Sequence, residues 1–89
     1  MIFVTLARVV PGKGTQFVEA LRSGAMDQSR LPEGVKAHSA YITYGQYDLV
    51  LILEARDLSA ENRALKQLIT TGIVTTETLV GQTVSEFIS

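Results

Sequence analysis

The sequence predicts an α+β fold of the ferredoxin-like type, a four-stranded antiparallel sheet with two helices on one face in the order βαββαβ. Two neighbouring segments, 35–44 and 47–55, are alternating or apolar and meet at Gly45-Gln46, which indicates a β-hairpin. The segments on either side of the hairpin space their apolar residues as helices do, and β-branched strands lie near both ends of the chain. A length of 89 residues predicts a single domain, residues 1–89.

The first strand and first helix follow from local signals. Residues 2–10 are β-branched and alternating, and Pro11-Gly12 ends that strand. We expect a helix to open at Gly14-Thr15 with Thr15 as its N-cap. Residues 25–34 are polar and contain Pro and Gly, which predicts the end of this helix followed by a loop. The apolar stripe of the helix comprises Phe17, Ala20, Leu21 and Ala25.

The hairpin register predicts the two faces of the sheet. A type II′ turn at Gly45-Gln46 would pair Tyr44 with Tyr47, and side chains would alternate outward from that pair. The predicted helix-side face carries His38, Ala40, Ile42, Tyr44, Tyr47, Leu49, Leu51 and Leu53. The other face carries Ala37, Ser39, Tyr41, Thr43, Asp48, Val50, Ile52 and Glu54. Since this second face is apolar in its middle, we expect a partner to cover it.

A second helix and a last strand complete the pattern. Asp57 or Ser59 is placed to cap the helix, with Glu61 in its first turn near the positive helix end. Gly72 suits the position after the helix. The last strand spans residues 74–84, and Gly81 indicates a bulge or bend in it. The predicted apolar stripe comprises Leu58, Leu65, Leu68 and Ile69.

Composition narrows the function classes. The chain has no Cys, so it has neither disulfides nor thiolate metal sites. Its net charge of −1 without a basic run argues against direct nucleic-acid binding. A hydrophobic content of 46% favours a buried interface between copies. No run of 18 apolar residues exists, and the N-terminal segment has the pattern of a strand, so we expect a cytoplasmic protein without membrane segments.

The residues of the hairpin and the last strand resemble two known families. The stretches YITYGQYDLVLILEA and VTTETLVGQTVSEF resemble the GYD-domain proteins, whose signature matches Gly45, Tyr47 and Asp48. They are also similar to the ligand-binding (RAM) domain of Lrp/AsnC regulators. Its T-x-G-x-x-D hairpin matches Thr43, Gly45 and Asp48, and its V-x-T-x-T strand matches Val74, Thr76 and Thr78.

The resemblance implies a dimeric α+β barrel, in which two ferredoxin-like sheets pack face to face with the helices outside. RAM domains bind amino acids or other small effectors, often between dimers, and assemble into larger rings. The sequence has no helix-turn-helix domain, so the resemblance implies a stand-alone module. The same superfamily includes cofactor-free monooxygenases that use a pocket between the sheet and the helices.

Three functions therefore remain open. The first is a non-catalytic homodimer or higher oligomer that binds a small-molecule effector near Tyr41, Thr43, Tyr47 and Asp48. The second is a small cofactor-free enzyme in which His38 and Tyr44, on the helix-side face, are the working pair. The enzyme hypothesis predicts an enclosed, partly polar cavity next to His38. The binding hypothesis predicts polar groups clustered at a subunit boundary. The third is an assembly protein with no ligand.

Each candidate residue also has a simpler interpretation. His38 is the only histidine, and one histidine does not make a metal site, so we expect neither a metal nor another cofactor. A carboxylate beside a turn, such as Asp48, commonly accepts hydrogen bonds that fix the turn. Tyrosines are frequent at interfaces, where a ring and a polar tip are both useful. Whether these residues form a functional site therefore depends on which of their side chains the fold brings into contact.

Overall fold

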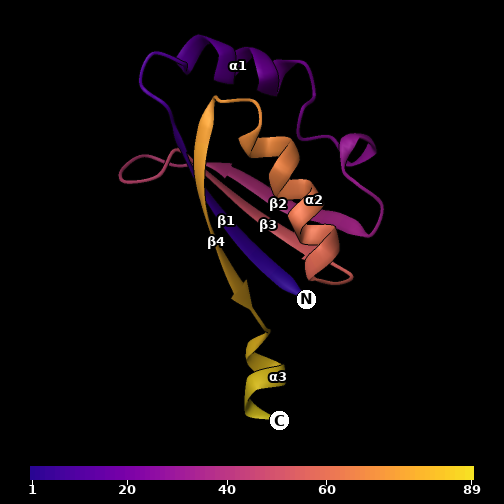
Figure 1. Ribbon diagram of the computed structural model, residues 1–89. Helices are drawn as coiled ribbons and strands as arrows, with labels where there is room; N and C mark the ends of the chain where they lie inside the picture. Colours follow the sequence, from indigo (N-terminus) through magenta and orange to yellow (C-terminus); the bar gives the residue numbers. More distant parts are fainter.

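A computed structural model describes residues 1–89 and confirms the βαββαβ order. The four strands form one antiparallel sheet in the order β2-β3-β1-β4 (Figure 1). The strands are β1 (Ile2–Val9), β2 (Val35–Ile42), β3 (Leu49–Ala55) and β4 (Val74–Gly81). The helices are α1 (Gly14–Arg22), α2 (Leu58–Ile69) and α3 (Val84–Ile88), with a 3-10 turn at Gln28–Arg30.

The hydrophobic core lies between the sheet and the helices α1 and α2. In Figure 1, α2 lies in front of the sheet and α1 crosses its upper end. Alternate residues of the two central strands face this side, because side chains of a strand alternate between its faces. Burying each large apolar side chain contributes about 1.5–3 kcal/mol. The buried strand residues are Phe3, Thr5, Ala7, Val35, Leu49, Leu51, Leu53, Ala55 and Val74.

Helix α1 packs loosely on the core. It begins at Gly14, within the predicted opening at Gly14-Thr15, but Lys13 rather than Thr15 is its N-cap, without a side-chain cap bond. Phe17, Ala20 and Leu21 face the core, but no residue of α1 is fully buried. Fewer buried contacts therefore hold α1 in place than hold the central strands of the sheet.

Helix α2 is capped as predicted but buries a different stripe. Asp57 Oδ1 accepts a hydrogen bond of 2.8 Å from the Ala60 backbone N–H, which confirms Asp57 as the cap. The buried residues of α2 are Ala60, Glu61 and Ala64, whereas Leu58 and Ile69 are exposed. The predicted stripe was therefore wrong at both ends. Small side chains line the contact, and they allow the helix backbone to approach the sheet closely.

A β-bulge in β2 changes which residues face the helices. Ser39 pairs with Ile52 but Ala37 pairs with Leu53, which leaves His38 as an extra residue. An extra residue reverses the faces of every side chain beyond it. The prediction that His38 faces the helices was therefore wrong, and so was the placement of Ala37 on the opposite face. Ala37 packs on the core.

The hairpin connection is longer than the predicted two-residue turn. The strands end at Ile42 and resume at Leu49, which leaves a loop of residues 43–48. Thr43 N donates to Asp48 O at 3.0 Å, so the predicted pairing of these two residues is kept. Gly45 has a φ of +138°, which a side chain would disfavour. Tyr44 is 97% exposed, and Tyr47 contacts Arg8 and Glu77 on the side of the sheet away from the helices, so the predicted helix-side position of both tyrosines was wrong.

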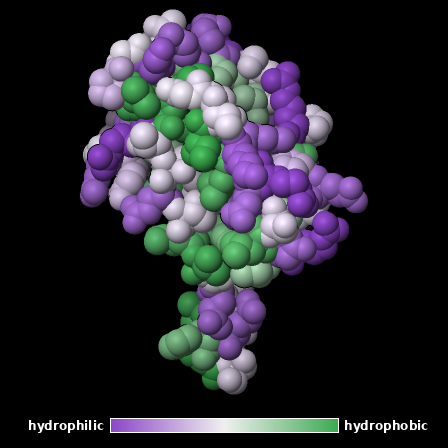
Figure 2. Space-filling model, in the orientation of Figure 1, coloured by the Kyte–Doolittle hydropathy of each residue, from purple (hydrophilic) through white to green (hydrophobic).

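Helix α3 is an element that the sequence analysis did not predict. The Thr83 side chain accepts from the Glu86 N–H and Glu86 Oε1 accepts from the Thr83 N–H, which is a capping box. Its signal, Thr-x-x-Glu, was present in the sequence. The helix projects away from the body and carries both apolar and polar side chains on its surface (Figures 1 and 2). Phe87 is 75% exposed. None of the helices is long and apolar enough to cross a membrane.

Candidate functional site

The sheet face opposite α1 and α2, here called the open face, is apolar in its middle. Cross-strand pairing aligns Tyr41, Val50, Leu6 and Glu77 in one row, and Ser39, Ile52, Val4 and Leu79 in the next. No helix lies on this side of the sheet, so its central apolar side chains are only half-buried. These are Val4, Leu6, Val50 and Ile52. The placement of Tyr41, Val50 and Ile52 together on the face away from the helices is as the register predicted.

A cluster of Arg8, Tyr47 and Glu77, here called the end cluster, lies at the loop end of the open face. The Tyr47 hydroxyl donates to Glu77 Oε2 at 2.6 Å. The Arg8 guanidinium lies 5.4 Å from the centre of the Tyr47 ring, and Arg8 Nε donates to the Gln46 carbonyl at 2.9 Å. Leu6, Arg8, Tyr47 and Glu77 line a surface depression of about 190 Å³ there.

In the end cluster, the positive Arg8 and the negative Glu77 both contact the side chain of Tyr47. The hydrogen bond to Glu77 raises the pKa of Tyr47 from its ordinary value of 10.0, so the tyrosine stays protonated at neutral pH. The hydroxyl is therefore a stable donor. A guanidinium and a carboxylate, held by one tyrosine, can receive a ligand with both an anionic and a cationic group.

Thr43 and Asp48, which the sequence predicted near a ligand, make hydrogen bonds that hold the loop. Asp48 Oδ2 accepts from the Val9 N–H at 2.8 Å, and Asp48 N donates to the Ala7 carbonyl at 2.9 Å. The Thr43 hydroxyl donates to the Tyr47 carbonyl at 2.7 Å. These bonds tie the 43–48 loop to β1 and thereby position Tyr47 beside Arg8. The contacts of Asp48 are those of a carboxylate that fixes a turn by accepting a hydrogen bond.

Replacing Asp48 with Ala is expected to destabilise the fold by about 1–3 kcal/mol, because the Val9 N–H loses its partly buried acceptor. Urea denaturation followed by circular dichroism measures the difference. Asp48→Asn is the matched control, since its amide oxygen can still accept from Val9, and it should cost less. Equal stability of Asp48→Ala and the unmodified chain would contradict the assigned role.

His38 lies at the opposite end of the open face, with Glu54. His38 Nε2 lies 2.7 Å from Glu54 Oε1, and both side chains are partly exposed. This hydrogen bond holds the pKa of Glu54 below its usual range. Tyr44 lies in the loop at the other end of β2, and it makes no side-chain contact with this pair. The fold therefore does not bring the predicted pair of His38 and Tyr44 together.

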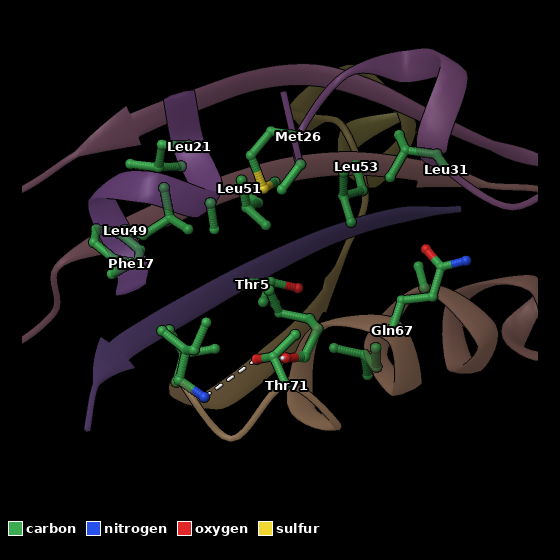
Figure 3. Close-up of a pocket in the computed structure, with 17 residues that line it drawn as sticks. Thr5, Phe17, Leu21, Met26, Leu31, Leu49, Leu51, Leu53, Gln67 and Thr71 are labelled. Atoms are coloured by element: carbon green, nitrogen blue, oxygen red, sulfur yellow. Dashed lines mark hydrogen bonds between the residues drawn. The ribbon is translucent and has the colours of Figure 1, made fainter. Parts of the chain in front are cut away.

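A cavity of about 120 Å³, here called the helix-side cavity, lies between the sheet and the helices α1 and α2 (Figure 3). Its walls are mostly apolar and come from β1, β3, β4, both helices and the segment after α1. Neither His38 nor Tyr44 lines it. The enzyme hypothesis predicted a partly polar cavity beside His38. The observed cavity is instead mostly apolar and does not include His38. Labelled lining residues include Thr5, Phe17, Leu21, Met26, Leu51 and Gln67.

Glu61 of α2 is a buried carboxyl group without a partner. It is 1% exposed, and neither carboxylate oxygen accepts a hydrogen bond. Burial raises the pKa of Glu61 above its ordinary value, because the charged form loses its hydration. Glu61 lies in the first turn of α2 as predicted, but its burial was not predicted from the sequence.

Arg8 and Glu77 were not predicted as members of a site. Their signal was the strand alternation, which places Arg8 on the face of Leu6 and Val4, away from the core. The contact with Tyr47 depended on the loop conformation. No three His, Cys, Asp or Glu side chains lie close enough together to hold a metal ion.

Comparisons with known proteins agree on the fold. The sequence model described as "GYD domain" matches residues 4–89. No curated protein sequence matches the chain. The crystal structure of FFRP-DM1 is similar with a TM-score of 0.62 and 22% identity, over 91% of this chain and 97% of that one. A hypothetical protein, PHS023 from Pyrococcus horikoshii, is similar with a TM-score of 0.51 and 22% identity, over 92% and 93% of the two chains.

Proposed function

This chain belongs to the GYD domain family, and we propose that it is a homo-oligomeric, non-catalytic module that binds a small zwitterionic metabolite of the amino-acid class. The observation that carries the proposal is the end cluster, where Arg8 and Glu77 flank Tyr47 at the edge of an apolar sheet face. The proposal rests on two steps, the covering of the open face and the charge pattern of the cluster.

The distribution of polar groups on the open face supports a second copy as its cover. Apolar side chains occupy the middle of the face, and polar groups lie at both ends, the end cluster at one and His38 with Glu54 at the other. Protein interfaces commonly have this anatomy of an apolar centre and a polar rim. A two-fold contact through this face would leave each end cluster at the boundary between subunits.

The charges of the end cluster favour an amino-acid ligand. A guanidinium binds a carboxylate through two parallel hydrogen bonds, and a carboxylate such as Glu77 binds an ammonium group. Tyr41 shares a cross-strand row with Glu77 and lies on the same face. In this proposal Arg8, Tyr47 and Glu77 contact the ligand, Tyr41 lies nearby, and Thr43 with Asp48 fix the loop.

The enzyme alternative has less support in the geometry. His38 lies within β2 and Tyr44 in the loop beyond its end, and no acidic or basic side chain lines the helix-side cavity. An assembly protein without a ligand is supported by the open face but leaves the end cluster unexplained. A ligand screen distinguishes this possibility from the proposed binding module.

A thermal-shift screen with amino acids and related metabolites is expected to find at least one ligand that raises the melting temperature. A ligand that binds only the folded state stabilises it by about 2.7 kcal/mol at a concentration of 100 times its Kd. Arg8→Lys should lose most of the shift, because an ammonium group cannot reproduce the two-pronged contact.

Arg22→Lys is the matched control, since Arg22 is exposed and makes only a long pair of 3.5 Å with Glu19. This variant should keep the full shift. The absence of a shift with every ligand at millimolar concentration would contradict the binding function. An undiminished shift in Arg8→Lys would place the site elsewhere on the molecule.

A further inference from the structure

We propose that the helix-side cavity is a second, separate ligand site, which takes a small uncharged apolar molecule such as an aromatic ring or a branched hydrocarbon. The cavity has a volume of about 120 Å³, and 14 of its 17 lining residues are hydrophobic. An apolar cavity of about 150 Å³ engineered into another protein stays dry and binds benzene. The volume here is of the same order.

The chemistry of the lining excludes charged or strongly polar ligands. Thr5 is fully buried, and its hydroxyl is already paired with that of Thr78 at 3.0 Å. The Thr71 hydroxyl donates to the Leu68 carbonyl at 2.8 Å and accepts from the Ile73 N–H at 3.2 Å (Figure 3). Apart from the amide of Gln67 at the exposed mouth, the lining offers a polar ligand group no free partner, so such a group would lose its hydration there without compensation. The zwitterion of the open face therefore does not fit this cavity.

The walls of the cavity also provide a route of entry. Three lining residues, Ala25, Gln67 and Thr71, are exposed, so the cavity reaches the surface at the end of α2 and after α1. Helix α1 forms one wall through Phe17, Ala20 and Leu21, yet none of its residues is fully buried. Elements with few buried contacts open at low free-energy cost, which allows α1 to move aside.

A bound apolar molecule would complete the contacts that the core lacks. Atoms that line an unfilled void lose dispersion contacts on one side, and a close-packed interior normally leaves few such voids. Occupancy of the cavity therefore stabilises the folded chain and tightens α1 against the sheet. The open face lies on the other side of the sheet, so this site does not depend on the end cluster.

Toluene is the probe for this site. We expect toluene at millimolar concentration to raise the melting temperature of the full chain and to shift the methyl NMR signals of Met26, Leu51 and Leu68, which line the cavity. Ala20→Leu, on α1, and Ala64→Leu, on α2, fill the cavity from two separate walls. Each folded variant should lose at least ten-fold in toluene affinity.

Gln16→Leu is the matched control, because it adds a leucine to an exposed position of α1 outside the cavity. It should bind toluene as the unmodified chain does. The proposal is overturned if toluene shifts none of the cavity methyl signals. It is also overturned if a folded Ala20→Leu or Ala64→Leu chain binds toluene with unchanged affinity.

Discussion

Replacing Ile52 with Glu is expected to convert an oligomer into monomers or into unfolded chain. Ile52 lies in the middle of the open face, in the row that joins Ser39, Val4 and Leu79. A second copy packed on this face would bury the new carboxylate without a partner, which costs several kcal/mol. Light scattering coupled to size-exclusion chromatography measures the mass, and circular dichroism reports whether the chain is folded.

Two further variants separate the effect of position from the effect of charge. Val50→Glu changes the neighbouring row of the same face and should act as Ile52→Glu does. Val18→Glu places the same charge on an exposed position of α1, on the other side of the sheet, and should keep the native mass. If Ile52→Glu has the native oligomer mass and a normal spectrum, the open face is not the interface.

Replacing Glu61 with Met is expected to stabilise the chain at pH 7 by about 1–3 kcal/mol, because a buried and unpaired charge gives way to an apolar side chain of similar length. In a chain of this size each kcal/mol raises the melting temperature by roughly 4–8 °C. The gain is expected to depend on pH, since only the charged form of Glu61 carries the cost.

The sign of the pH dependence follows from the direction of the shift. Burial raises the pKa of Glu61 in the folded chain above its ordinary value of 4.5, so the folded chain holds the proton more tightly. The favourable contribution of the protonated group is complete below that ordinary value and is lost as pH rises through the raised pKa. The stability gap between Glu61→Met and the unmodified chain should therefore widen from pH 4 towards pH 7.

Glu19→Met is the control, because Glu19 is exposed, and a surface change of this kind stays within about 0.5 kcal/mol. Melting temperatures of the three chains across this pH range provide the test. A gap that does not change with pH, or an unmodified chain as stable as Glu61→Met at pH 7, would show that the Glu61 carboxylate is solvated or paired.

Much of the fold was predictable because the signals were local. Alternation in residues 2–10, the Asp57 cap and the apolar run 49–53 each depend on neighbours in sequence. Where such local signals were present, the observed strands and helices begin and end close to the predicted residues. The βαββαβ order then left few topologies, and the observed sheet order is one of them.

The errors arose where one residue changed the register or where a side chain met a distant element. The bulge at His38 moved this residue from the helix side to the open face, beside Glu54. The six-residue loop turned Tyr47 towards Arg8 and Glu77, which lie far from it in sequence. The burial of Glu61 depended on how closely α2 approaches the sheet, which its helical periodicity does not specify.

The sequence by itself determined the order of strands and helices and the existence of a sheet face with more apolar side chains than its own helices cover. It could do so because hydrophobic periodicity acts over a few residues. Only the tertiary structure decided which polar groups meet, that is, the Arg8–Tyr47–Glu77 cluster and the pair of His38 and Glu54. Such meetings depend on strand register and loop conformation, where a single inserted residue reverses the faces of a strand.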